Sequence, residues 1–84
     1  MSGAYQPAYS EPALEALLEA DAGQRADAQA VISRLCRTPG RSGDYRERDD
    51  TGRWVEVALV DGVLVTYWAD HAVRELRISF IEFP

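Results

Sequence analysis

The stretch that most constrains the fold is residues 54–83, WVEVALVDGVLVTYWADHAVRELRISFIEF. Asp61-Gly62 is a strong hairpin signal within it, because a two-residue turn requires positive φ angles that glycine adopts without steric cost. Asp70-His71 is a plausible second turn. The stretch therefore predicts three consecutive antiparallel strands joined by two tight turns, with the upstream residues covering one face of this sheet.

The two turns also predict how the strands pair. The first turn pairs Val60 with Val63, Ala58 with Val65 and Glu56 with Tyr67. A two-residue second turn pairs Tyr67 with Arg74, Val65 with Leu76 and Val63 with Ile78. A slip of one residue would move Glu75 and Arg77 onto the apolar face, so the hydrophobic pattern supports this register.

The predicted pairing divides the sheet into two faces. One is apolar in its middle and should take the helices; it carries Ala58, Val60, Val63, Val65, Tyr67, Leu76 and Ile78. The other carries Val55, Val57, Leu59, Leu64, Thr66, Trp68, Val73, Glu75, Arg77 and Ser79. An uncovered apolar patch with a polar rim usually marks an interaction surface. We therefore expect a partner to bind Val55, Val57, Leu59, Leu64 and Trp68. The alternative is a face that is only partly exposed to solvent, or one that the N-terminal arm covers.

Residues 11–37 carry the signals of a helical hairpin. Ser10 can cap a first helix, and the Glu-Pro that follows suits a first turn. Asp21 can cap a second helix, with Gln24 reaching back from three residues later. Thr-Pro-Gly at 38–40 ends this helix. A single helix with a kink is the alternative.

The order of these segments predicts the fold class. We expect residues 1–84 to form a single domain, in which 1–9 are an edge strand or a loose arm and 44–83 are antiparallel strands. We predict an α+β fold in which the hairpin of residues 11–37 packs on one face of a four- or five-stranded antiparallel sheet.

Charge and composition narrow the range of partners. The chain has a formal net charge of −5, and all of its nine basic residues are arginine. An acidic chain is a poor nonspecific binder of nucleic acid, so the charge argues against RNA or the ribosome as a partner. Cys36 is the only cysteine and is expected to be a buried apolar residue.

Several kinds of site have no pattern in the sequence. One histidine and one cysteine far apart match no metal-ligand spacing, and we expect neither a metal nor a cofactor. No glycine-rich phosphate loop is present. There is no signal peptide and no apolar run long enough to span a bilayer, so no membrane association and a cytoplasmic location are expected.

Several short motifs resemble a known family. They are Ala13-Leu14 with Leu17 in the first helix, Leu35 with Pro39 closing the second, and Gly43-Asp44-Tyr45-Arg46 opening the sheet. In this order they resemble the RelE/ParE toxin superfamily of bacterial toxin–antitoxin systems. The resemblance implies a cytoplasmic toxin neutralised by an antitoxin protein. It implies either metal-independent cleavage of messenger RNA on the ribosome or inhibition of gyrase.

The resemblance also suggests residues for ribonuclease chemistry. By position, Arg46 and Arg48 resemble basic residues on the family's second strand, and Arg77 would share their surface. Arginines would stabilise the phosphorane, and His71 or Glu75 would act as acid or base. The ribonuclease members are usually basic and place Tyr or His near the C-terminus, whereas this chain is acidic and ends ISFIEFP.

The connection after Arg48 decides which face these arginines occupy. A turn of two or four residues puts Arg46 and Arg48 on the open face, the side of the sheet away from the helices. A turn of three residues puts them on the helix side. We expect the open face, because it keeps two guanidinium groups out of the core.

A different class of function fits the same fold. The chain would then be a non-enzymatic dimerisation or protein-interaction module. It would self-associate through Val57, Leu59, Leu64 and Trp68, and Trp68→Asp would yield a monomer.

Overall fold

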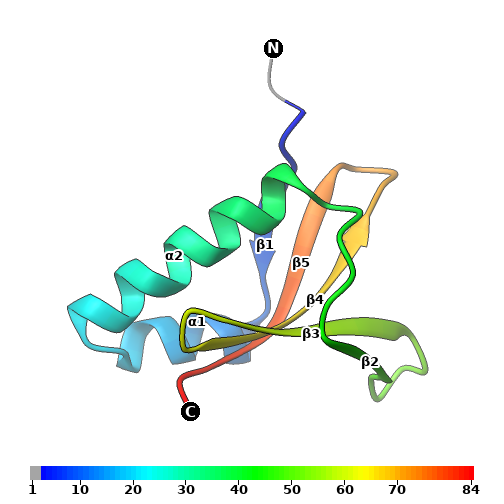
Figure 1. Ribbon diagram of the computed structural model, residues 1–84. Coiled ribbons are helices and arrows are strands. Elements are labelled where there is room, and N and C mark those ends of the chain that lie inside the picture. The colour runs from blue at the N-terminus through cyan, green and yellow to red at the C-terminus, as the bar shows by residue number, and fades with distance from the viewer. Residues whose placement is uncertain (1–2) are drawn as a thin grey trace.

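The computed structural model describes residues 3–84 and shows a five-stranded sheet with two helices on one of its faces (Figure 1). The elements are β1 (Gln6–Tyr9), α1 (Glu11–Glu19), α2 (Ala22–Arg37), β2 (Tyr45–Arg48), β3 (Trp54–Val60), β4 (Val63–Asp70) and β5 (Glu75–Glu82). The strands lie in the order β1-β5-β4-β3-β2. The predicted α+β fold is confirmed. Residues 1–2 of the expected N-terminal arm lie outside the described part.

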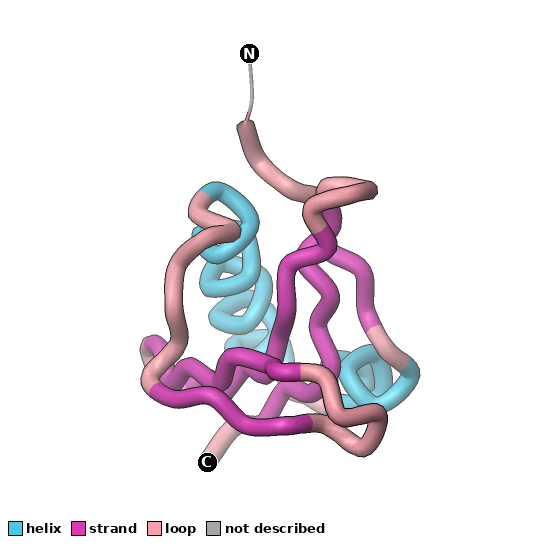
Figure 2. Tube along the Cα trace, turned by 90° about the vertical axis from the view of Figure 1, so that its right-hand side faces the viewer, coloured by secondary structure: helices cyan, strands magenta, loops and turns pink. Residues whose placement is uncertain are grey.

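Strand β1 makes the sheet mixed rather than wholly antiparallel, because it pairs in parallel with β5. The backbone amides of Gln6 and Ser10 donate to carbonyls at Arg74 and Ile78. Successive backbone N–H groups of a strand point to opposite sides. The nitrogen of Pro7, which carries no hydrogen, therefore faces away from β5, where no hydrogen-bond partner is needed. The sheet is strongly twisted, and β2 and β3 run across the direction of the other strands (Figure 2).

Two capped helices form the predicted hairpin, rather than one kinked helix. The Ser10 side chain accepts a hydrogen bond from the amide of Ala13 at the start of α1. Asp21 and Gln24 form both bonds of a capping box at the start of α2. Helix α2 ends at Arg37, immediately before the predicted terminator. These local bonds satisfy amides that have no partner within a helix.

The first predicted turn and its register are confirmed. Asp61 and Gly62 have φ angles of 51° and 79°, as a two-residue hairpin turn of type I′ requires. Val60 pairs with Val63, and Glu56 pairs with Tyr67.

The second predicted register is wrong, because β4 and β5 are joined by four residues, 71–74, rather than two. Tyr67 pairs with Ile78 instead of Arg74. The shift along β5 is an even number of residues, so Leu76 and Ile78 stay on the helix side. A bulge beside Thr66 then changes the alternation within β5.

The core fills the space between the helices and the sheet. Its buried members are Ala13, Leu17, Ala28, Val31, Ile32, Leu35, Cys36, Ala58, Val63, Val65, Tyr67, Leu76, Ile78 and Ile81. The residues predicted to face the helices all belong to this cluster, except Val60, which packs against it partly buried. Each large apolar side chain buried here contributes about 1.5–3 kcal/mol to stability.

Candidate functional site

The face of the sheet turned away from the helices, called the open face below, carries a row of side chains across four strands. Tyr45 pairs with Val57, Val57 with Thr66, and Thr66 with Phe80. Directly paired residues project to the same side, so the four lie next to one another. The two in the middle are buried, whereas Tyr45 and Phe80 at the ends are 54% and 51% exposed.

The residues expected to contact a partner differ in accessibility. Val55 and Val57 are buried, Leu64 and Trp68 are half-buried, and Leu59 is 52% exposed. Neither valine belongs to the core cluster that packs on the helices, so other side chains of the twisted sheet bury them. The accessible apolar part of the open face is therefore narrower than the sequence suggests.

Tyr45 and Phe80 are exposed aromatic residues of the open face that sequence reasoning missed. The place of Tyr45 depends on the length of the connection between β2 and β3. Simple alternation from Ile78 would turn Phe80 toward the helices, and only the bulge beside Thr66 brings it to the open face. The sequence shows neither the length of this connection nor the bulge.

Two guanidinium groups approach the ring of Trp68. The Cζ atoms of Arg53 and Arg77 lie 3.9 and 5.8 Å from the ring centroid, within the range of cation–π contacts. Arg77 also lies 3.0 Å from Glu75 and 3.8 Å from Asp70. The charge of Arg77 is therefore compensated where it sits.

Arg46 and Arg48 lie on the helix side of the sheet, so the expectation that they share the open face is wrong. Arg46 pairs with Glu56, which alternates with the core residue Ala58. Arg48 pairs with Trp54, and its Cζ lies 4.4 Å from the centroid of that ring.

The reason is the connection between β2 and β3, which has five residues, 49–53. A connection with an odd number of residues places the side chains of β2 on the face opposite to that given by an even number. Asp49 stabilises this connection, because its Oδ1 accepts hydrogen bonds from the amides of Thr51 and Arg53. All residues of β2 are exposed, so its arginines stay in water although they point to the helix side.

A groove of about 380 Å³ lies beside the loop that follows α2, against strands β2, β3 and β4. Its charged, aromatic and imidazole lining residues are Arg41, Arg46, Arg53, Glu56, Trp54, Trp68 and His71. Three arginines against one glutamate give this basic groove a formal charge of +2 (3 − 1), although the chain carries −5.

The loop that forms one wall of the basic groove is tied to the sheet. The Tyr67 hydroxyl donates to the backbone oxygen of Arg41 at 3.1 Å. Glu56 accepts from the amide of Gly43 and from Nε of Arg46, both at 2.7 Å. At Gly43 an added Cβ would lie 2.6 Å from the backbone oxygen of Val57, so only glycine allows this close approach.

His71 lies in the turn between β4 and β5 and also lines the basic groove. Its Nδ1 lies 2.7 Å from the hydroxyl oxygen of Tyr5. When Tyr5 donates this hydrogen bond, a neutral His71 carries its proton on Nε2. The imidazole then presents a donor away from Tyr5.

The five candidate catalytic residues do not form one cluster. Arg46 and His71 line the basic groove, and Arg48 stacks on Trp54. Arg77 and Glu75 pair with each other on the open face.

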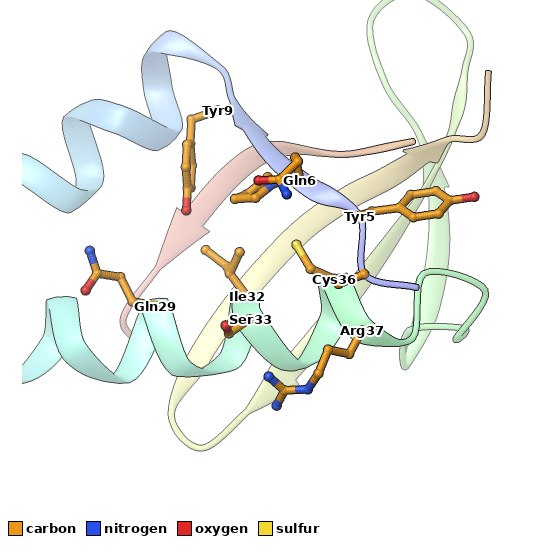
Figure 3. Close-up of a pocket in the computed structure, with 10 residues that line it drawn as sticks. Tyr5, Gln6, Tyr9, Gln29, Ile32, Ser33, Cys36 and Arg37 are labelled. Carbon is orange, nitrogen blue, oxygen red and sulfur yellow. The ribbon is translucent and has the colours of Figure 1, made fainter. Parts of the chain in front are cut away.

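A second cavity, of about 410 Å³, lies between β1 and α2 (Figure 3). Cys36 points into this space from α2 toward β1, and Tyr9 points from the other side. Burial raises the pKa of the Cys36 thiol and of the Tyr9 hydroxyl. Cys36 is 4% exposed and packs as an apolar residue, as expected, and its raised pKa disfavours the thiolate that a nucleophile needs.

Among residues 3–84, no three His, Cys, Asp or Glu side chains are placed to hold a metal ion. No helix in this part of the chain is both long and apolar enough to cross a membrane.

No protein-family model and no curated protein matches the chain. Two crystal structures of toxin–antitoxin complexes contain a chain of similar fold. One is the RelBE2 complex from Mycobacterium tuberculosis, with a TM-score of 0.78 and 17% identity over 96% of this chain and 99% of that chain. The other is the intact E. coli RelBE complex, with a TM-score of 0.64 and 12% identity over 96% and 98%. The chain therefore has the fold of RelE-like toxins.

Proposed function

We propose that the chain is a toxin-family protein that binds an antitoxin through its open face. The observation that carries this proposal is the fold, which it shares over almost its full length with a chain of two toxin–antitoxin complexes. The accessible side chains Tyr45, Leu59 and Phe80 support the location. Exposed aromatic residues beside buried apolar ones are typical of the centres of protein interfaces.

The first experiment measures growth of a bacterial host that expresses the chain, with and without the protein encoded by the neighbouring gene. We expect growth inhibition that the neighbour relieves, and a complex of the two purified proteins. Growth without inhibition and without a complex would contradict the proposal.

The location is tested with Leu59→Asp and Phe80→Asp, which place a charge on the open face. Each should weaken the complex by about 2 kcal/mol or more, as loss of an interface hot spot does. Leu18→Asp is the matched control, because Leu18 is 78% exposed on α1, away from this face. Equal weakening by all three variants would argue against the open face.

Messenger RNA cleavage without a metal is a second, finer hypothesis. It is favoured by Arg46 and His71, which line one groove. His71 would take the 2′-hydroxyl proton or protonate the leaving 5′-oxygen, while arginine stabilises the phosphorane. Arg77 and Glu75 are less suited, because they pair with each other and do not line the groove. Purified protein with ribosomes and messenger RNA tests this, with Arg46→Ala and Arg48→Ala expected to abolish cleavage and growth inhibition.

Self-association through the open face is the rival from a different class. Light scattering of the purified chain separates the two: a tight homodimer that Trp68→Asp converts to monomer, together with harmless expression, would favour a dimerisation module.

A further inference from the structure

The basic groove concentrates positive charge on an acidic molecule. Its lining residues carry a formal charge of +2 (three arginines minus one glutamate), whereas the whole chain carries −5. Arg53 also lies 3.9 Å from Asp49, outside the lining, so the charge of Arg53 is partly compensated. The positive charge of the groove attracts an anionic ligand. The Debye length in physiological salt is about 8 Å, so this attraction acts only over short distances. The groove therefore favours an anion that concentrates its charge within the groove.

The groove is held in shape before any ligand arrives. Tyr67, which is 2% exposed, holds the backbone of Arg41, and Glu56 links Gly43 to Arg46. A wall fixed by partly buried and charge-assisted hydrogen bonds loses little freedom on binding, so more of the contact energy becomes affinity.

Donors in the groove have capacity left for a carboxylate. The guanidinium of Arg41 forms no ion pair within the described residues. Arg46 bonds Glu56 through Nε, its side chain is 61% exposed, and its terminal nitrogens are not engaged in that bond. Guanidinium groups bind carboxylates through two parallel hydrogen bonds. The Nε2 of His71 adds a third donor when the Tyr5 hydroxyl donates to Nδ1.

Apolar surface lies among these donors. Trp54 is 54% exposed and lines the groove together with Pro39 and Ala69. A ligand that matches the whole groove therefore carries carboxylates next to apolar groups.

We propose that the basic groove binds an acidic segment of a protein, in which Asp or Glu alternates with apolar residues. The carboxylates bind Arg41 and Arg46, and an apolar side chain packs on Trp54. The inference rests on the proposed function only in that the segment would belong to the same partner that covers the open face.

Charge favours a peptide over RNA. A polynucleotide extends its charge beyond the groove, and it would meet acidic residues of and beside β2, at Asp44, Glu47 and Asp50. A peptide can place its carboxylates only where the arginines are. A peptide is therefore repelled less than a polynucleotide by a chain of net charge −5.

The test uses a fluorescein-labelled synthetic decapeptide of alternating Glu and Leu, its Gln-for-Glu counterpart, and a labelled oligoribonucleotide. Binding is followed by fluorescence anisotropy at fixed ionic strength. Both tryptophans of the chain line the groove, so their fluorescence reports on occupancy of the site. We expect the acidic peptide to bind at least about tenfold more tightly than the Gln counterpart and to change tryptophan emission.

Two matched variants locate the site. Arg41→Glu should weaken binding of the acidic peptide by about tenfold or more. Arg37→Glu makes the same change of charge at the end of α2, outside the groove, and should change binding by less than about twofold. Circular dichroism checks that both variants remain folded, and Arg41→Gln provides a second variant if one does not.

Three outcomes would overturn the proposal: equal weakening by both variants, no binding of the acidic peptide, or tighter binding of the oligoribonucleotide. The last would favour the RNA-cleavage hypothesis instead. None of them bears on the open face, since antitoxin binding and rescue of growth are measured separately with Leu59→Asp and Phe80→Asp.

Discussion

Glu56 is the side chain that joins the two walls of the basic groove. Its carboxylate accepts one hydrogen bond from the amide of Gly43, in the loop, and one from Arg46, on strand β2. A carboxylate that bridges a backbone amide and a guanidinium fixes the distance between them. The shape of the groove therefore depends on one residue of β3 that faces the helix side.

Gly43→Ala should lower the free energy of unfolding by about 1–3 kcal/mol, the usual range for forcing extra volume into a packed site. The reason is that the new Cβ would lie 2.6 Å from the backbone oxygen of Val57, which cannot yield as a side chain would. Urea denaturation measures the change. Gly40→Ala is the control, because nothing lies within 4 Å of its Cβ. A loss as large at Gly40 would contradict the steric explanation.

At the scale of elements, the lengths of the connections decide which side chains share a face. Two residues join β3 to β4, four join β4 to β5, and five join β2 to β3. Changing a connection by one residue turns every side chain of the following strand to the other side. The odd connection at 49–53 is why Arg46 meets Glu56 and Tyr45 meets Val57.

The capping box of α2 predicts a second change in stability. Asp21→Ala removes the acceptor for the Gln24 amide and should cost about 1 kcal/mol. Thermal unfolding monitored by circular dichroism measures it. Asp27→Ala, at an exposed position within α2, should be neutral or slightly stabilising, since alanine is the better residue in a helix interior. If Asp27→Ala costs as much, the cap is not the cause.

At the scale of the whole molecule, the structure presents two candidate binding surfaces, which meet at Trp68. The open face presents exposed apolar side chains, at Leu59 and Phe80 among others. The basic groove presents arginines around a tied loop. A single partner with an apolar segment and an acidic one could use both, which would add the two contributions to affinity.

Alkaline pH should destabilise the whole fold. Burial is the main cause that raises the pKa of Cys36 above 9.0 and of Tyr9 and Tyr67 above 10.0. Above these ordinary values the unfolded chain releases protons that the folded chain retains, so stability is fully present below about pH 9 and falls as the pH rises through the folded pKa values.

Urea midpoints at about pH 8 and about pH 10.5 measure this loss. In Cys36→Ala and Tyr67→Phe the difference between the two midpoints should shrink, because each variant lacks one of the groups. An unchanged difference in both variants would show that other groups cause the alkaline loss.

Much of the fold was predictable because its signals are local. The caps at Ser10 and Asp21 and the turn at Asp61-Gly62 involve bonds within a few residues, and all three appear as expected. The face that packs on the helices was also predictable. The error in the register of β5 was an even number of residues up to Ile78, so Leu76 and Ile78 kept their face, and only beyond the bulge does Phe80 change sides.

The candidate sites were less predictable. The sequence placed Val55, Val57 and Leu59 correctly on the open face, but it could not show that the two valines are buried. It placed Arg46 on the wrong face, because the sequence does not show how many residues the connection around Asp49 contains. The catalytic roles of Arg46, Arg48, Arg77, His71 and Glu75 stay predictions.

By itself, the sequence determined the helical hairpin, the first β-hairpin and the alternation of apolar residues, since these depend on neighbours along the chain. Only the tertiary structure decided that Phe80 reaches the open face and that Arg41, Arg46 and His71 meet in one groove. These outcomes depend on a bulge, on the parity of two connections and on the contact between Gly43 and Val57. Each joins segments far apart in sequence, and the energy that selects it exists only when the whole sheet has formed.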